Sequence, residues 1–157
     1  VSLDSLVRVN ETVSPRELNH FGQRRAVTIT ANLAPGYALG EALAPLAARG
    51  FLVIASGNVT HNLRDYQTVA RSGGQTPAYV REFSDWMAAR LAAHDIPALL
   101  DYRRQAPGAV QAHPSDEHLL PLYVALGAGG ENAQAQRFHA GIDDYVIAMD
   151  AYSFLPQ

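Results

Sequence analysis

Two short stretches of the chain place histidines beside turn-forming residues. Residues 56–62 read SGNVTHN and carry His61, while residues 113–118 read HPSDEH and carry His113 and His118. The first stretch directly follows a strongly apolar segment, and the second directly precedes one. Loops at the ends of rigid elements are where a scaffold presents imidazoles to a metal or a substrate. The chain has no cysteine, so a metal here would be held by nitrogen and oxygen ligands.

Each of these histidines also has a purely structural interpretation. His61 follows a turn, where its side chain could cap the next helix. His118 stands beside Leu119 and Leu120 early in a predicted helix, where a hydrogen-bonded core histidine is the commoner case. The residue types alone leave both interpretations open. Three other histidines are predicted to lie on the surface: His20, His94 and His139.

Length, charge and composition limit the classes of function. A chain of 157 residues fits one compact domain. The net charge is −3 and the basic residues are scattered, which argues against a nucleic-acid-binding stripe. No apolar run approaches the roughly 20 residues of a membrane span, and the first residues lack the pattern of a secretory signal. The sequence therefore predicts a cytoplasmic protein that neither binds nucleic acid nor spans a membrane.

The apolar pattern of the first third predicts an α/β fold. Residues 25–33 read RAVTITANL, a β-branched and roughly alternating run that predicts a strand. Residues 39–49 are rich in alanine and leucine and stop at Gly50, which predicts a short helix. Residues 51–55 read FLVIA, and a continuous apolar run predicts a strand buried on both faces. Strand, helix and buried strand form a βαβ pattern, so we expect a mixed or mostly parallel sheet flanked by helices.

The rest of the chain predicts further helices and one more strand. The clearest helix begins after Thr76, and others are expected at residues 96–104 and 116–126. Residues 127–140 are polar and glycine-rich, which predicts a mobile loop, and residues 144–155 predict a final strand of the sheet. The helix after Thr76 has an apolar stripe that faces a core, formed by Tyr79, Val80, Phe83, Trp86, Met87 and Leu91.

Several separated motifs of this chain occur in one order in a known family. They are LAPL at 43–46, GFLVI at 50–54, SGNVTHNLR at 56–64, Phe83 with Trp86, AHPSDEHLLPL at 112–122, VALGA at 124–128 and Gly130 with Glu131. From about residue 39 onward the sequence resembles the C-terminal half of class III extradiol ring-cleaving dioxygenases. It is most similar to their 4,5-DOPA dioxygenase-like branch. The resemblance implies a partial, half-sized dioxygenase-like domain.

The first residues resemble a different family. Residues 1–7 read VSLDSLV, residues 11–21 read ETVSPRELNHF, and residues 23–36 read QRRAVTITANLAPG. These motifs resemble a periplasmic porter segment of resistance-nodulation-division efflux pumps. The two resemblances meet near residues 39–43, which predicts a chimeric chain with a porter-like segment at 1–43 and a dioxygenase-like region at 44–157.

The dioxygenase resemblance implies a non-haem metal, Fe(II) or Zn(II), and a catechol-type aromatic substrate that is cleaved with dioxygen. Such chemistry needs a few facial protein ligands and a nearby acid or base, for which histidine is suited. The resemblance implies that His118 is a metal ligand and that His61 is an acid/base or a metal-proximal ligand. His113 would be catalytic, either facing the substrate or standing behind the ligands. In the resembled branch the first ligands come from an N-terminal half that this chain lacks, so we expect weak metal binding.

Three functions are therefore compared. The first is an extradiol dioxygenase-like protein that is incomplete and weakly active or inactive alone. The second is a structural or transport-related α/β module, derived in part from an efflux porter and without catalysis. The third is a small metal-binding domain that keeps a half-site without turnover. A half-sized domain also exposes sheet edge and apolar surface, so self-association is expected.

Overall fold

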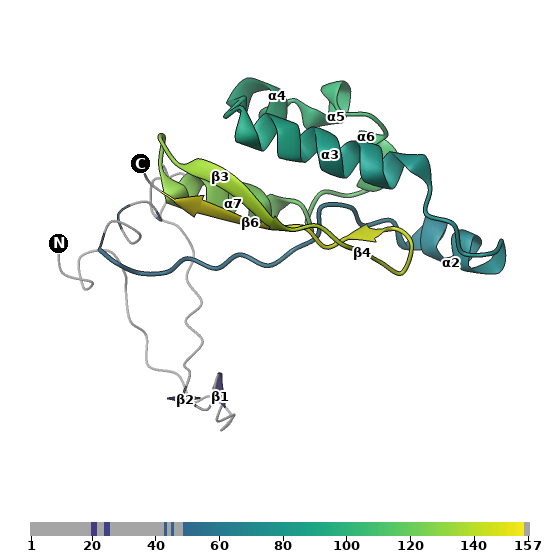
Figure 1. Ribbon diagram of the computed structural model, residues 1–157, viewed down its shortest axis with the longest axis horizontal. Helices are drawn as coiled ribbons and strands as arrows, with labels where there is room; N and C mark the ends of the chain where they lie inside the picture. Colours follow the sequence, from purple (N-terminus) through teal and green to yellow (C-terminus); the bar gives the residue numbers. More distant parts are fainter. Residues whose placement is uncertain (1–19, 22–23, 26–42, 44, 46–48, 156–157) are drawn as a thin grey trace. The chain divides into compact units, whose positions relative to one another are not determined.

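The computed structural model describes residues 20–21, 24–25, 43, 45 and 49–155 (Figure 1). The chain divides into two units, Val1–Gly36 and Tyr37–Gln157. In the first unit, β1 (His20–Phe21) pairs antiparallel with β2 (Arg24–Arg25). The predicted strand at 25–33 and most of the predicted helix at 39–49 lie outside the described residues.

The second unit is α/β, as the sequence predicts. Three strand pairs are present in the described part of the chain, and each of them is antiparallel. In the second unit, β3 pairs with β6 and β4 pairs with β5. Its elements are α2 (Leu63–Arg71), α3 (Ala78–Ala92), α4 (Ile96–Leu100), α5 (Tyr102–Gln105), α6 (Ala109–Ala112), α7 (Leu120–Gly129), β3 (Gln134–His139), β4 (Ile142–Asp143), β5 (Ile147–Ala148) and β6 (Ala151–Leu155).

The core of this unit is built on α3. The helix begins after Pro77, whose fixed φ suits a helix start, and its predicted apolar stripe is buried apart from the half-buried Trp86. Val80, Phe83 and Met87 are each 0 % exposed. Helix α3 contacts α4, α6, β3 and β5, and Figure 1 shows α3 to α6 gathered on one side of the β3–β6 pair. The prediction of this helix and of its core face is confirmed.

Five predicted elements differ from the structure. The helix expected from residue 116 begins only at Leu120 and follows a turn in which the carbonyl of Asp116 accepts the N–H groups of Leu119 and Leu120. The helix expected at 96–104 is broken at Asp101 into α4 and α5. The loop expected at 127–140 is wrong.

In place of that loop, α7 continues to Gly129 and β3 follows it. Strand β3 is stabilised by its antiparallel pairing with β6, a long-range interaction that the composition of β3 does not reveal. The single strand expected at 144–155 is also divided. Asp144 and Tyr145 have positive φ and turn the chain between β4 and β5, so that only β6 forms the longer strand.

The buried strand predicted at 51–55 is absent, and this prediction is wrong. The segment is extended, as Figure 1 shows, but has no strand partner among the described residues. Phe51 is 57 %, Leu52 84 % and Ile54 74 % exposed. A β-strand is defined by hydrogen bonds to a neighbouring strand. Residues 51–55 have no such neighbour in the described part of the chain, so their apolar composition does not make them a strand. No helix in the described part of the chain is long and apolar enough to cross a membrane.

Candidate functional site

Backbone hydrogen bonds hold the segment after the extended run against the loop that precedes α7. The N–H of Asn58 donates to the carbonyl of His118 at 2.9 Å. The N–H of His61 donates to the carbonyl of Ala112, also at 2.9 Å. These two bonds join segments more than 50 residues apart in sequence. They bring the two histidine-bearing motifs of the sequence side by side.

The same segment is also tied to β5. Val59 donates its N–H to the carbonyl of Ala148 at 2.9 Å. The fully buried hydroxyl of Thr60 donates to the carbonyl of Val146 and accepts from the N–H of Ala148, each at 2.7 Å. Buried hydroxyls are costly unless they are hydrogen-bonded, and this one satisfies both roles. The backbone of Val59 and Thr60 is therefore rigidly placed before His61.

Asn62, and not His61, caps α2. The side-chain oxygen of Asn62 accepts the N–H groups of Arg64 at 3.1 Å and Asp65 at 3.2 Å. Its amide nitrogen donates to the carbonyl of Gln111 at 2.7 Å. This arrangement is the preferred N-cap geometry. The imidazole of His61 is thus free of the capping role that the sequence left open for it.

The imidazoles of His61 and His118 lie against each other. Their ring centroids are 3.8 Å apart and their planes are inclined at 37°. Both rings are half-buried. Glu117 reaches the same place, with its Oε1 3.9 Å from Nε2 of His118. The structure therefore brings together two of the three histidines that the sequence singled out, and both remain partly exposed to solvent.

Burial lowers the pKa of His61, and the neighbouring His118 lowers it further, while Glu117 opposes the shift. Partial burial and a positive charge on the neighbouring ring both disfavour the protonated form of His61. His61 is consequently held neutral at neutral pH. A neutral imidazole can accept a proton or donate a lone pair to a cation.

His113 lies apart from this pair. Its side chain is 0 % exposed, and its Nε2 is 2.6 Å from the carbonyl oxygen of Val59. Its Nδ1 has no hydrogen-bond partner among the described residues. Burial lowers the pKa of His113, against the effect of the Val59 carbonyl. The ring is therefore neutral and inside the protein, and it does not face the groove described below.

These shifts predict that acidification destabilises the fold. In the folded protein the pKa values of His61 and His113 lie below their ordinary value of 6.5. As the pH falls, these two histidines are therefore protonated in the unfolded chain before they are protonated in the folded one. Stability is therefore lost as the pH falls below 6.5. Urea midpoints measured from pH 7.5 to 5 should decrease, and less so in His113→Gln than in a control with the exposed His139→Gln. Equal decreases in both variants would contradict this assignment.

Gly57 allows the two motifs to approach closely. A Cβ at this position would lie 2.2 Å from the carbonyl oxygen of His118 and 3.1 Å from Cγ of Pro121. The first contact is with the backbone, which cannot rotate away as a flexible side chain does. The absence of a side chain at Gly57 therefore lets the two motifs lie this close.

Gly57→Ala is expected to separate the two histidine motifs. The added methyl group must displace the turn around His118, at a cost of about 1–3 kcal/mol. Ser56→Ala is the matched control, because Ser56 is exposed beside it. Urea unfolding and the nuclear Overhauser effect between the rings of His61 and His118 measure the two consequences. A Gly57→Ala protein with wild-type stability and ring contact would show that the approach is looser than described.

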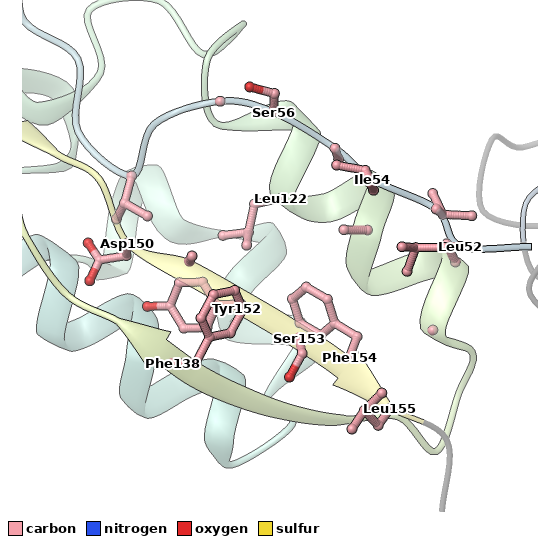
Figure 2. Close-up of a pocket in the computed structure, with 18 of the residues that line it drawn as sticks. Leu52, Ile54, Ser56, Leu122, Phe138, Asp150, Tyr152, Ser153, Phe154 and Leu155 are labelled. Carbon is pink, nitrogen blue, oxygen red and sulfur yellow. The ribbon is translucent and has the colours of Figure 1, made fainter. Parts of the chain in front are cut away.

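A groove of about 860 Å³ extends from His118 (Figure 2). Its walls are residues 51–59, α7 and β6, together with Phe138 of β3. Figure 2 shows Phe138, Tyr152 and Phe154 gathered on one side of it. An apolar, aromatic-lined groove with a few polar groups is the usual form of a small-molecule site.

One buried ion pair beside this groove was missed by sequence reasoning. Asp150 lines the groove, its side chain is 1 % exposed, and it pairs with Arg137. Ser84 donates to Asp150 at 2.9 Å, and Arg137 also reaches Asp85 at 3.0 Å. The network joins α3 to β3 and to the start of β6. No local pattern in the sequence indicates it, because its members are up to 66 residues apart.

The described residues offer two nitrogen donors to a metal but not a complete set. Among them, no three side chains of histidine, cysteine, aspartate or glutamate are grouped so that they could hold an ion. The imidazoles of His61 and His118 are adjacent and partly exposed, and that of His61 is neutral, which fits two positions of a metal site.

Comparison with known proteins identifies the family of this chain. The family model described as the catalytic LigB subunit of aromatic ring-opening dioxygenase matches residues 26–148. This match begins within residues 1–43, the segment for which the sequence predicts an efflux-porter origin, and it includes both histidine motifs.

Curated relatives and a solved structure match the same region. The 4,5-DOPA dioxygenase extradiol of Beta vulgaris is 37 % identical over 118 residues, which is 75 % of this chain and 43 % of that protein. The protein of the same name from Mirabilis jalapa is 35 % identical over 121 residues, or 76 % of this chain and 44 % of that protein. The crystal structure of an uncharacterized Escherichia coli K12 protein matches with a TM-score of 0.58 and 28 % identity, over 73 % of this chain and 47 % of its own.

The chain thus spans less than half the length of the curated relatives it matches. The family match covers well over half of this chain, including the two motifs that the fold brings together. The chain belongs to the family of the catalytic LigB subunit of aromatic ring-opening dioxygenases.

Proposed function

We propose that this chain carries half of an extradiol dioxygenase site, which cleaves a catechol-type ring with dioxygen and is weakly active or inactive alone. The observation that carries the proposal is the contact between the imidazoles of His61 and His118 beside an aromatic-lined groove. The relatives' name, 4,5-DOPA dioxygenase extradiol, supports an aromatic diol as the substrate class. A cytoplasmic location is part of the same proposal.

In this proposal His118 and His61 hold a non-haem metal, Fe(II) or Zn(II). A metal bound there would supply Lewis-acid chemistry and, in the case of Fe(II), electron transfer to dioxygen. Non-haem iron oxygenases commonly use three facial ligands. The two histidines are two such donors, and the third lies outside the described residues or on another polypeptide. Metal affinity of the isolated chain is therefore expected to be weak.

His61 has two possible roles, and alanine variants separate them. As a ligand it donates a lone pair to the metal, whereas as a general base it accepts the proton of a catechol hydroxyl. If His61 is a ligand, His61→Ala loses metal affinity as His118→Ala does. If it is the base, His61→Ala keeps the metal and loses turnover. The neutral state of the ring is compatible with both roles.

The reaction balances without a further reductant. One carbon–carbon bond of the ring next to the diol breaks, and both atoms of dioxygen enter the product as new carbonyl and carboxylate oxygens. The catechol supplies the electrons that reduce dioxygen. The conjugated ring-opened product absorbs visible light, so the conversion can be followed optically.

The test uses the full chain with Fe(II), loaded without air and then mixed with oxygen and a substituted catechol. Oxygen uptake with a yellow product, absent from His118→Ala, supports the proposal. Metal binding without uptake assigns the chain to the third function, a metal-binding half-site. Absence of both metal and uptake refutes the proposal and leaves a structural module.

Self-association through the unpaired segment at 51–55 is a second part of the proposal. Its extended backbone has no strand partner among the described residues, and the apolar side chains of Phe51, Leu52 and Ile54 are exposed. Identical edges of two copies can pair antiparallel about a two-fold axis. Sedimentation should show a dimer that Leu52→Glu converts to monomer, whereas Leu100→Glu, at a leucine that is also exposed, should leave the dimer intact. A wild-type monomer at high concentration would contradict it.

We also propose that the segment at 1–43 derives from an efflux porter, which makes the chain chimeric. The motifs at 1–7, 11–21 and 23–36 support this origin. If the segment contributes nothing to the site, a chain that begins at residue 44 should keep the metal affinity of the full chain. Loss of that affinity would show that the segment supports the site.

A further inference from the structure

The side chain of His113 is enclosed where α6 ends. His113 is the C-cap residue of that helix, and its ring centroid lies 5.6 Å from that of Phe83, a core residue of α3. Both side chains are 0 % exposed. Arg103 of α5 donates to the carbonyl of His113 at 3.0 Å. The residue is thus held by two helices and has little freedom to move.

The contact with Val59 determines which ring nitrogen of His113 carries the proton. A carbonyl oxygen only accepts hydrogen bonds, so Nε2 at 2.6 Å must be the donor. The lone pair then resides on Nδ1, which is buried and lacks a partner among the described residues. Transfer of a proton from Nε2 would break the bond to Val59. His113 is therefore poorly suited to exchange protons with a substrate in the groove.

The hydrogen bond from His113 to Val59 is one of two hydrogen bonds that hold the backbone of residues 59–61. The carbonyl of Ala112 accepts the N–H of His61, while the ring of His113 donates to the carbonyl of Val59. Ala112 and His113 are consecutive, and together they hold both ends of the segment 59–61. The chain after His113 leads within five residues to His118, whose carbonyl anchors Asn58.

We infer that His113 is a positioning residue: its Nε2–H holds the Val59 carbonyl so that the ring of His61 meets the ring of His118. The inference deepens the proposed function, since it assigns His113 to orienting the imidazole pair and not to proton transfer. It concerns the geometry of the pair, so it can be tested whether or not the chain turns over a catechol.

The test compares His113→Gln with His113→Leu in the full chain. The glutamine amide can donate from nearly the place of Nε2, whereas leucine fills the space without a donor. In the leucine variant, exchange of the His61 amide hydrogen should accelerate about tenfold and Zn(II) affinity should fall about tenfold, because the Val59 carbonyl loses its partner. The ring contact between His61 and His118 should weaken in parallel. In the glutamine variant all three should stay within about threefold of wild type.

Other outcomes overturn the inference. If leucine leaves amide exchange and Zn(II) affinity unchanged, the bond to Val59 positions nothing. If both variants keep the imidazole pair and Zn(II) affinity but lose any oxygen uptake equally, His113 is a catalytic acid or base. Should the leucine variant fail to fold, as Trp86 fluorescence would show, the glutamine variant decides alone. A folded His113→Gln protein with an unprotected His61 amide refutes the inference.

Discussion

Zn(II) binding by this chain is expected to weaken at least about tenfold, or by about 1.4 kcal/mol, when either His118 or His61 is replaced by alanine. Each substitution removes one of the two imidazole nitrogens that the fold brings together at a ring separation of 3.8 Å. For His61 this holds if it acts as a ligand. Isothermal titration calorimetry at pH 7.5, where His61 is neutral, measures the affinity directly.

The control for this prediction is His139→Ala. His139 is exposed at the end of β3 and belongs to neither histidine motif, so its removal should leave the affinity within about twofold of wild type. If all three variants bind Zn(II) as the wild type does, the ion resides elsewhere and the half-site is refuted. If His118→Ala alone loses affinity, His61 is the acid/base and not a ligand.

Phe83→Ala is expected to lower the free energy of unfolding by about 3–5 kcal/mol. Phe83 is 0 % exposed at the centre of α3 and contacts the rings of Tyr102 and His113. Its removal leaves a cavity that the helices on either side cannot close, and the cavity adds to the lost transfer free energy. Urea unfolding followed by Trp86 fluorescence measures the change, provided that the slope against urea is unchanged.

Phe138→Ala is the matched control for this second prediction. Phe138 is 66 % exposed at the groove, so the same substitution should change stability by no more than about 0.5 kcal/mol. An equally large loss at Phe138 would mean that the groove is closed in solution, for example by a second copy of the chain. A small loss at Phe83 would place the core elsewhere.

The packing of Phe83 against the ring of His113 links the stability of the core to the geometry of the histidine pair. Phe83 packs against the ring that holds the Val59 carbonyl, so the core helix supports the position of His61 through one intermediate residue. Partial loss of this support should loosen the imidazole pair before the protein unfolds. Amide exchange at His61 in Phe83→Ala should therefore accelerate more than the global change in stability requires.

Several features of this protein follow from sequence alone. The apolar spacing after Thr76 predicts α3 and its buried face, because a helical period is a local property. The motifs around His61 and His118 identify the family from residue types and order. The composition indicates nitrogen and oxygen ligands in place of thiolates. Each of these depends on residues close together in the chain.

Tertiary structure alone decides the rest. Residues 51–55 have the composition of a buried strand, but a strand requires a partner, and none is present among the described residues. Conversely, β3 has a polar composition and is a strand because β6 pairs with it. The meeting of His61 with His118, and the enclosure of His113, depend on hydrogen bonds between segments about 50 residues apart. Local patterns encode periodicity and turns, whereas the partners of strands and imidazoles are selected by the packing of the whole chain.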